Sequence, residues 1–423
     1  MTKRPLAEWL QRLEAIHPAE IELGLDRIRT VASALNLLPY PLPVVTIAGT
    51  NGKGSTAAVL ERVLRADGMT TGLSTSPHFL RFNERIRVNG APVSDADITA
   101  SFDRIDAARG DTTLTYFEFA TLSSLLIFLQ HDADIAILEV GLGGRLDAMN
   151  LVDADIAVIT SIALDHQDWL GDSRELIGRE KAGIARSGKP VVVADNDPPA
   201  GLLEFLHDVG AMPLRIGEDF GARGDTVFVH IDNPSTAVPC TYPPALRAEN
   251  VAAALQVAAL LGVDLATLDV TALVCAAAPP GRLQRVLRDD REYLLDVAHN
   301  PAAVENLLEY LDANPGPGKT LALFSVMADK DIHAMMRRCK SRFDEWFLAD
   351  LAQVPRAASS SQVAAILHEQ EEYNVVCFEA PDTAFAEAQS RLQAHDRLVV
   401  FGSFHTVAGV LPLLGGDRRE TGN

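Results

Sequence analysis

Residues 44–55 read VVTIAGTNGKGS, an apolar run followed by a glycine-rich turn, and a helix-patterned stretch follows at 56–65. Strand, glycine turn and helix in this order place backbone N–H groups and a helix N-terminus around one anion. Lys53 adds a point charge that suits a phosphate group, and Ser55 or Thr56 adds a hydroxyl that suits Mg²⁺. The stretch therefore predicts a P-loop-type α/β domain that binds ATP.

The turn departs from the usual phosphate-binding loop in two ways. Counting back from Gly52 and Lys53, the first glycine of the usual pattern falls at Ile47, and Gly54 stands between the lysine and the hydroxyl. The alternative interpretation is a tight strand-to-helix turn that needs glycines only for its backbone. Because strand, lysine and hydroxyl are all present, we favour phosphate binding.

The composition is that of an ordinary globular protein long enough for two domains. The chain has 423 residues, of which 48% are apolar and 22% are charged. Residues 1–30 show no signal-peptide pattern, and the longest apolar run, 125–129, is too short to span a bilayer. The 4 cysteines form no CxxC pair, which suits reduced thiols in a cytosol. We expect a cytoplasmic protein with no membrane partner.

The net charge limits the kinds of partner. A formal charge of −20 argues against nucleic acid, whose phosphate backbone needs a basic face. Small anionic ligands remain compatible, because a local cluster of cations can invert the field. One such cluster is Arg81, Arg85 and Arg87, for which the alternative is a solvated strand edge.

Apolar runs rich in valine and isoleucine alternate with helix-patterned segments along the chain. The runs are 44–48, 71–75, 135–140, 156–162 and 190–194 in the first half, and 293–297, 320–326, 346–349, 375–378 and 398–401 in the second. Such alternation predicts mainly parallel sheets covered on both faces. Pro279-Pro280-Gly281 reads as a linker. We expect an ATPase-like domain over 1–285 and a smaller Rossmann-like α/β domain over 286–423.

Two candidate ligand residues lie at or just after the carboxyl end of the run 135–140. Glu139 stands near the carboxyl end of that strand, where ligands of open α/β sheets gather, so it is placed to reach a nucleotide-bound metal. The structural alternative is a buried glutamate paired with Arg145. The next residues, GLGGRLD at 141–147, lack the third glycine of a dinucleotide fingerprint, because Leu146 occupies its place. These glycines favour close approach to a planar ligand, with Asp147 as a polar anchor.

Three further segments carry polar residues that suit a binding site. His166 follows the run 156–162, and a neutral imidazole there is either a metal ligand near Glu139 or a hydrogen-bonded structural histidine. Residues 179–184 read as an exposed helix turn, and composition does not single out Lys181. The segment Asp296–Pro301 overlaps the end of the run 293–297 and continues beyond it. It is either a ligand-binding strand end or an Asx cap at a helix start.

Together these segments resemble the bacterial folylpolyglutamate synthase/dihydrofolate synthase family, whose members are relatives of the Mur peptidoglycan ligases. The matching segments are 49–55, 74–78 (STSPH), 115–118 (TYFE), 139–150, 164–171 (LDHQDWLG), 179–184, 281–282 and 296–301. They come in the family's order and span most of the chain. The resemblance is therefore specific, and it implies roles that spacing alone does not show.

The implied roles fall into three sets. The resemblance implies Mg²⁺ ligands at Ser76, Glu139, His166 and Lys181, the last as an N-carboxylated (carbamylated) lysine beside a second metal ion, with K⁺ as a further candidate cation. It implies ATP contacts at Thr50, Asn51, Gly52, Lys53, Gly54, Ser55, Asn250, Arg282, Asp296 and His299. It implies a pterin pocket lined by Glu22, Leu23, Gly24, Thr115, Tyr116, Phe117, Glu118, Leu146, Asp147 and Ala148. Lys53, Lys181 and His166 are the expected catalytic residues.

The resemblance also implies the reaction. The family ligates L-glutamate to 7,8-dihydropteroate and to the γ-carboxylate of folates such as tetrahydrofolates, through an acyl phosphate made from ATP. Arg81, Arg85 or Arg145 is expected to steer the acidic substrates, and the enzyme is expected to act as a monomer. The alternatives are a folylpolyglutamate synthase without the dihydropteroate activity, a Mur-type ligase, and a nucleotide switch. The Mur-type ligase is disfavoured because no uridine-nucleotide-binding domain precedes the loop.

Overall fold

The computed structural model describes residues 4–17, 22–230 and 236–415, and its contacts divide the chain into two units. The first unit comprises residues 1–163 and 167–278, and the second comprises residues 164–166 and 279–423. The predicted linker at Pro279 therefore opens the second unit. The boundary predicted after Arg285 falls inside strand β12 (Gln284–Arg288), which is hydrogen-bonded to β13 (Arg291–Leu295) of the second sheet.

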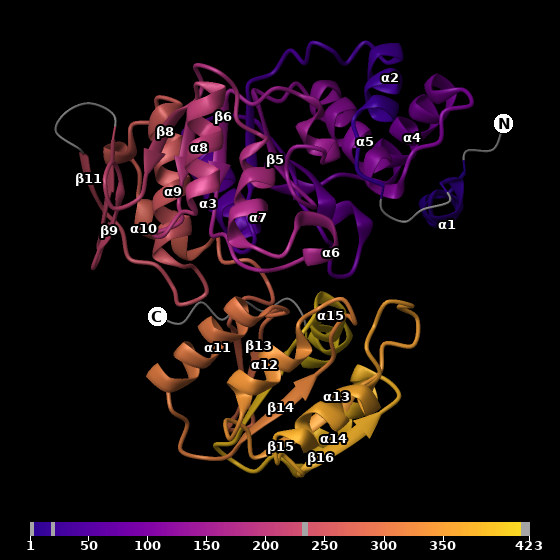
Figure 1. The fold of residues 1–423 in the computed structure, drawn as a ribbon, viewed down its shortest axis with the longest axis vertical. Helices are drawn as coiled ribbons and strands as arrows, with labels where there is room; N and C mark the ends of the chain where they lie inside the picture. The colour runs from indigo at the N-terminus through magenta and orange to yellow at the C-terminus, as the bar shows by residue number, and fades with distance from the viewer. Residues whose placement is uncertain (1–3, 18–21, 231–235, 416–423) are drawn as a thin grey trace. The chain divides into compact units, whose positions relative to one another are not determined.

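The first unit is built on an eight-stranded sheet in the order β4-β3-β2-β5-β1-β6-β7-β8. Figure 1 labels β5, β6 and β8 of this sheet. Its strands are β1 (Val44–Ala48), β2 (Thr71–Ser74), β3 (Ile86–Val88), β4 (Ala91–Pro92), β5 (Ile135–Glu139), β6 (Ile156–Ile159), β7 (Pro190–Val193) and β8 (Met212–Arg215). All neighbouring strands are parallel except β2–β3 and β3–β4. The mainly parallel sheet predicted from the alternating pattern is confirmed.

Helices cover both faces of this sheet. They are α1 (Leu6–Ile16), α2 (Asp26–Ala34), α3 (Lys53–Ala66), α4 (Asp95–Arg109), α5 (Tyr116–Gln130), α6 (Gln167–Leu170), α7 (Arg174–Ala182), α8 (Ala200–Val209), α9 (Ala248–Leu260) and α10 (Val270–Cys275), with short 3₁₀ turns η1 (Phe82–Arg85), η2 (Ala148–Leu151) and η3 (Leu265–Thr267). All five residues of β1 are buried. Val45 and Ile47 join the core under α3 and α9, whereas Val44 and Ala48 join the cores on the other face.

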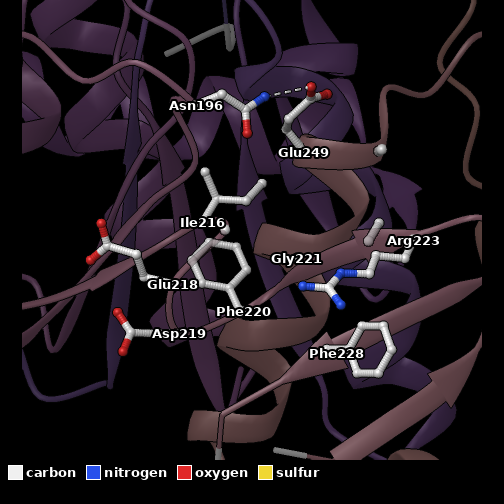
Figure 2. A pocket seen from close by; sticks show the side chains of 12 residues that line it. Asn196, Ile216, Glu218, Asp219, Phe220, Gly221, Arg223, Phe228 and Glu249 are labelled. Atoms are coloured by element: carbon white, nitrogen blue, oxygen red, sulfur yellow. Dashed lines mark hydrogen bonds between the residues drawn. The ribbon is translucent and has the colours of Figure 1, made fainter.

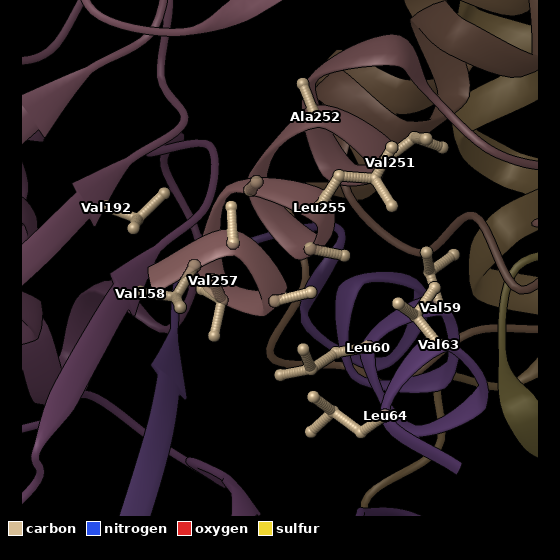
Figure 3. Packing of buried hydrophobic residues seen from close by; sticks show 14 of the residues in the cluster. Val59, Leu60, Val63, Leu64, Val158, Val192, Val251, Ala252, Leu255 and Val257 are labelled. Carbon is tan, nitrogen blue, oxygen red and sulfur yellow. The ribbon is translucent and has the colours of Figure 1, made fainter. Parts of the chain in front are cut away.

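Helices α3 and α9 pack against each other over the sheet (Figure 3). Leu60 and Leu64 of α3 and Leu255 of α9 are completely buried in one apolar cluster. Burial of each such side chain contributes about 1.5–3 kcal/mol. This packing fixes the start of both helices relative to the strand ends, where the candidate ligand residues lie.

The second unit contains a six-stranded sheet in the order β12-β13-β17-β14-β15-β16, parallel except for β12–β13. Besides β12 and β13, its strands are β14 (Thr320–Phe324), β15 (Glu345–Ala349), β16 (Val375–Phe378) and β17 (Arg397–Phe401), and its helices are α11 (Pro301–Ala313), α12 (Ile332–Cys339), α13 (Ser360–Glu369), α14 (Pro381–Arg391), α15 (Phe404–Val410) and the 3₁₀ turn η4 (Leu411–Leu414). The predicted smaller α/β domain is confirmed.

The strands that the apolar runs did not predict lie at or next to sheet edges, with β3 second from the edge, between β4 and β2. They are β3, β4, β8 and β12, together with β9 (Gly221–Arg223) and β11 (Thr236–Pro239), which flank β10 (Thr226–Val229) in a separate three-stranded antiparallel sheet. Their sequences mix polar residues, glycine and proline, which edge strands tolerate. Among the helices of the described residues, none is both long and apolar enough to cross a lipid bilayer.

Candidate active site

The turn after β1 requires its glycines for close backbone approach. Gly49 has φ +148°, and a Cβ there would lie 1.7 Å from Thr160 Oγ1. Gly52 has φ +94°, and a Cβ there would lie 2.3 Å from Asn250 Oδ1. Helix α3 begins at Lys53, earlier than the predicted start at residue 56. The turn therefore presents a helix N-terminus, and it brings Asn250 of α9 against the loop.

The remaining loop residues are held by backbone contacts. Thr50 N–H donates to Ser161 O at 2.7 Å, and the Thr50 hydroxyl contacts both the carbonyl (3.1 Å) and the N–H (3.0 Å) of Ala163. Asn51 forms a β-bridge with Ser161. Gly54 and Ser55 lie in the first turn of α3. The Thr50 side chain therefore holds the loop in place against the end of β6.

Two lysines converge on one carbonyl of this loop. Lys53 Nζ donates to Gly49 O at 3.0 Å and to Thr50 O at 3.3 Å, and Lys181 Nζ donates to Gly49 O at 3.0 Å. Lys181 is only 5% exposed, so the interpretation of residues 179–184 as an exposed turn is wrong at this position. The cause is that α7 packs against Gly144, whose added Cβ would lie 2.8 Å from Lys181 O. Two ammonium groups here create a field that suits an anion.

Glu139, the last residue of β5, borders the same loop and is 5% exposed. Glu139 Oε2 accepts the N–H of Ser76 at 3.2 Å, and it would lie 3.7 Å from a Cβ on Gly54. Arg145, the partner in the structural alternative, instead pairs with Glu180 at 3.1 Å. Among the described residues no three His, Cys, Asp or Glu side chains gather as a metal-binding group. Glu139 is therefore a carboxylate that adjoins the loop after β1, residues 49–55, which we call the phosphate-type loop.

The loop after β5 is organised by Asp147. This buried carboxylate accepts the N–H groups of Leu142 at 2.8 Å and Met149 at 2.9 Å. Burial raises the pKa of Asp147 to about 6, although these backbone donors and the charge of Lys53 oppose the shift. Asn150 donates to Gly183 O at 3.1 Å, which ties this loop to the end of α7. Asp147 thus shapes the loop, and its role as a polar anchor for a planar ligand stays a prediction.

The stretches that were expected to line the pterin pocket lie next to one another. Gly24 N–H donates to Leu146 O at 3.2 Å, which places residues 22–24 beside residues 146–148. Phe117 packs against Gly141, where a Cβ would lie 2.7 Å from the ring. Leu23 is half-buried and Ala148 is buried. The structure therefore brings these stretches together with the loop after β5.

Some of these residues also have local structural roles. Thr115 caps α5: its hydroxyl accepts the Glu118 N–H at 3.2 Å, and Glu118 Oε2 accepts the Thr115 N–H at 2.7 Å. Arg27 of α2 pairs with Glu118 at 3.3 Å and also with Glu22. Tyr116 lies under the guanidinium of Arg85, at 5.5 Å from its ring centroid. Glu22 and Glu118 are thus joined through Arg27, which the sequence patterns did not single out.

In the second unit, the strand-end motif after β13 is a buried polar cluster. Asp296 accepts the N–H groups of Leu283 and Ala298, both at 2.8 Å. Burial raises the pKa of Asp296, and the charge of Arg282 opposes this. Arg282 lies over the Phe404 ring at 5.5 Å. Asn300 caps α11 by accepting the Ala303 N–H at 2.9 Å, so the predicted Asx cap is present.

Residues 164–166 belong to this second unit, where Lys330 holds them. Lys330 Nζ, 6% exposed, donates to Asp165 Oδ1 at 2.6 Å and lies 3.3 Å from His166 Nε2. Asp165 Oδ2 accepts from Asn300 at 3.1 Å. Burial alone would raise the pKa of Asp165, but Lys330, His166 and His299 hold it well below its usual range. Lys330 was missed from the sequence; the run Asp329-Lys330-Asp331, soon after β14, was the available signal.

His166 and Glu139 were expected to share a metal ion. The structure places Glu139 in the first unit and His166 in the second. Their joint role therefore stays a prediction.

His299 is neutral at pH 7. Its Nδ1 donates to Val297 O at 2.8 Å, and burial, with the charge of Lys330, lowers its pKa to about 4 although Asp165 opposes this. Between pH 6.5 and 4 the unfolded chain binds a proton that the folded chain does not, so acidification destabilises the fold. Lowering the pH across this window should reduce the free energy of unfolding of wild type by about 1–3 kcal/mol more than that of His299→Gln. Urea unfolding at pH 7 and 4.5 checks this; a constant difference would contradict it.

A cavity of about 380 Å³ lies in the first unit, outside all the predicted site residues. It is formed by residues 216–223 with Asn196, Phe228, Ala248 and Glu249. Figure 2 shows Asn196 hydrogen-bonded to Glu249. Carboxylates at Glu218, Asp219 and Glu249 outnumber the one arginine of its lining. This lining does not favour phosphate or an acidic folate.

Comparison with known proteins identifies relatives over almost the whole chain. The Mur ligase middle domain matches residues 47–219, and the Mur ligase glutamate ligase domain matches residues 281–404. The dihydrofolate synthase/folylpolyglutamate synthase of Escherichia coli K12 is 43% identical over 99% of this chain and 97% of its own length.

Solved structures agree. Escherichia coli FolC in complex with DHPP and ADP matches with TM-score 0.89 and 41% identity, covering 97% of this chain and 98% of that chain. A bifunctional folylpolyglutamate synthase/dihydrofolate synthase with Mn, AMPPNP and L-glutamate bound matches with TM-score 0.87 and 42% identity, with the same coverage. The similarity therefore includes both units of the chain.

Proposed function

Because the chain belongs to the dihydrofolate synthase/folylpolyglutamate synthase family of Mur ligases, we propose that it joins L-glutamate to 7,8-dihydropteroate and to the γ-carboxylate of folates, at the expense of ATP. The observation that carries this proposal is the loop after β1, where Lys53 and Lys181 meet at Gly49 O beside the carboxylate of Glu139. Relatives that bind ADP, DHPP and L-glutamate support it.

The chemistry of the proposed reaction explains why a phosphate site is needed. A carboxylate does not react with an amine at neutral pH, because oxide is a poor leaving group. ATP activates the carboxylate: its γ-phosphoryl group passes to the carboxylate oxygen, and ADP leaves. The resulting acyl phosphate has phosphate as its leaving group. The glutamate amine then attacks the acyl carbon, loses a proton, and inorganic phosphate leaves with the carboxylate oxygen. The products are an amide, ADP and phosphate, so the atoms balance.

The loop residues stabilise this phosphoryl transfer by charge and position. Lys53 and the N-terminus of α3 face the same anion and neutralise the charge that spreads over its oxygens. We assign further ATP contacts to Asn51, Gly52, Gly54 and Ser55 of the loop itself, and to Asn250, which adjoins the loop at Gly52. Arg282, Asp296 and His299 of the second unit complete the proposed set of ATP contacts. We assign the acidic substrate to the stretches 22–24, 115–118 and 146–148.

A divalent metal ion fits the first-unit residues. The buried carboxylate of Glu139 lies beside Gly54, and oxygen ligands of this kind suit Mg²⁺. We propose that Ser76, Glu139 and His166 hold Mg²⁺, and that Lys181 helps to hold a second Mg²⁺ as a carbamate. K⁺ is a further proposed cation. A bound Mg²⁺ would neutralise phosphate charge during transfer.

Loss of a metal ligand is expected to weaken metal use more than folding. In Glu139→Ala or His166→Ala we expect the Mg²⁺ concentration for half-maximal turnover to rise at least about tenfold, in line with lost ligand bonds. Glu218→Ala removes an exposed carboxylate that pairs with Arg215 and serves as control. A metal titration that gives unchanged half-saturation in both variants would return these residues to a structural role.

The proposed function is tested by ADP release from purified protein. We expect release with dihydropteroate and with tetrahydrofolate, in each case dependent on L-glutamate. Activity with tetrahydrofolate alone would favour a folylpolyglutamate synthase without the dihydropteroate activity. Glutamate-independent ATP hydrolysis would favour a nucleotide switch and would contradict the ligase proposal.

The proposed partners are the small-molecule substrates alone. We propose that the protein acts as a monomer in the cytoplasm, without a nucleic-acid or membrane partner. The net charge of −20 supports the absence of nucleic-acid binding.

A further inference from the structure

Arg85, the last residue of η1, lies among aromatic rings and a histidine. Its Nε donates to His78 Nδ1 at 2.8 Å. Its guanidinium carbon lies 5.9 Å from the Phe82 ring centroid and 5.5 Å from the Tyr116 ring centroid. Burial lowers the pKa of Arg85, and the nearby carboxylate of Glu139 is among the charges that oppose this. These contacts fix the plane of a half-buried cation.

The other arginines considered for substrate steering already have carboxylate partners. Arg81 pairs with Asp95 at 3.2 Å, and Arg145 pairs with Glu180 at 3.1 Å. Arg87, the third member of the sequence cluster, pairs with Glu61 at 3.4 Å. Within the described part of the chain, no ion pair includes Arg85. Arg85 therefore differs from its neighbours in sequence.

The two carboxylates whose charges act on Arg85, Glu84 and Glu139, accept hydrogen bonds from backbone N–H groups. Glu84 accepts the backbone N–H groups of Phe79 at 2.7 Å, Leu80 at 2.9 Å and Arg81 at 2.7 Å, and so holds the loop before Arg85. Glu139 accepts the Ser76 N–H and borders the phosphate-type loop at Gly54. Partial burial removes water from the guanidinium and costs free energy. No bound carboxylate compensates that desolvation penalty here. An anionic ligand would supply the missing partner.

We propose that Arg85 binds the carboxylate of the acceptor substrate, the aromatic carboxylate of a pteroate, and orients it for phosphorylation. Arg85 touches Tyr116 of the stretch assigned to the pterin, and it lies near Glu139, which borders the phosphate-type loop. A carboxylate bound by Arg85 would lie between the stretch assigned to the pterin and the loop that we propose binds ATP, and phosphoryl transfer depends on such positioning. The planar guanidinium matches a carboxylate through two parallel hydrogen bonds. This inference rests on the proposed function.

The test removes the charge from each side of the contact in turn. Equilibrium binding of 7,8-dihydropteroate and of its methyl ester is measured on wild type, Arg85→Ala and Arg85→Lys. We expect Arg85→Ala to weaken binding of the acid by about tenfold or more, as for a lost charge-assisted hydrogen bond, and to leave ester binding unchanged. Arg85→Lys should recover part of the loss for the acid. Arg338→Ala, which removes an exposed arginine that pairs with Glu305 outside the proposed site, should change neither ligand's affinity.

Equal losses for acid and ester in Arg85→Ala would overturn the inference, because Arg85 would then act only through packing. Affinity for a non-hydrolysable ATP analogue, together with thermal unfolding, reports whether each variant is folded. If both variants fail to fold, wild type alone decides, since it must prefer the acid over the ester by about tenfold or more. Failure of the proposed function is separate: wild type would then release no ADP with dihydropteroate and glutamate, whatever Arg85 binds.

Discussion

Lys53→Ala is expected to abolish ligation with dihydropteroate and with tetrahydrofolate alike, because both reactions use one phosphoryl-transfer site. Lys53 is the first residue of α3, and its ammonium donates hydrogen bonds to the carbonyl groups of Gly49 and Thr50. Loss of a group that stabilises transition-state charge costs about 10²–10³ in kcat, or about 3–4 kcal/mol. Steady-state turnover with each acceptor, at saturating ATP and glutamate, measures the effect.

The matched control for this variant is Lys189→Ala. Lys189 is half exposed and pairs with Asp155 at 2.9 Å, so its removal takes away the same charge at a surface site. We expect near wild-type turnover in the control. Loss of one activity in Lys53→Ala with the other near wild type would refute a shared site.

Lys181→Ala is expected to lose most activity with both acceptors, because we propose that Lys181 acts as a carbamate beside the metal ions. Its Nζ shares Gly49 O with Lys53, so a bare ammonium there repels both Lys53 and any dication. Addition of CO₂ to the neutral amine releases a proton and turns the cation into an anion, which removes both conflicts. Lys181→Glu should retain more activity than Lys181→Ala, because it supplies a carboxylate at shorter reach.

The carbamate has a readout besides activity. Protein refolded with ¹³C-bicarbonate should show a carbamate carbon signal that Lys181→Ala lacks and Lys189→Ala keeps. Protein refolded without bicarbonate and CO₂ should regain activity when bicarbonate is added. An unmodified Lys181 amine in the active protein, with both metal ions bound, would show that the carbamate proposal is wrong.

The backbone of the site could be predicted from sequence because its signals are local. The signals lie within residues 44–53. The apolar run indicates a buried strand, and the glycines at 49 and 52 indicate a tight turn before Lys53. The run that ends at Glu139 is likewise a buried strand, and parallel strands bring their carboxyl ends to one edge. Strand-end placement of Glu139 and Asp296 therefore followed from periodicity alone.

The side-chain partners could not be predicted, because they join residues distant in sequence. The charged run at 329–331 draws attention to Lys330, but no local pattern predicts that it pairs with Asp165. None predicts that Arg27 joins Glu22 to Glu118. The burial of Lys181 follows from the close approach of Gly144, not from the composition of α7.

The arginine cluster makes the same point. Sequence spacing treats Arg81, Arg85 and Arg87 alike, whereas the structure gives two of them carboxylate partners and the third a histidine. Only tertiary packing distinguishes these three cations.

The transfer of oxygen from substrate to phosphate tests the central claim most directly. Dihydropteroate labelled with ¹⁸O in its carboxylate is incubated with the protein, ATP and L-glutamate, and the released phosphate is analysed by mass spectrometry. If the carboxylate is phosphorylated before the amine attacks, each phosphate carries one ¹⁸O atom, and the dihydrofolate amide keeps the other. Unlabelled phosphate released alongside product would contradict an acyl-phosphate ligase.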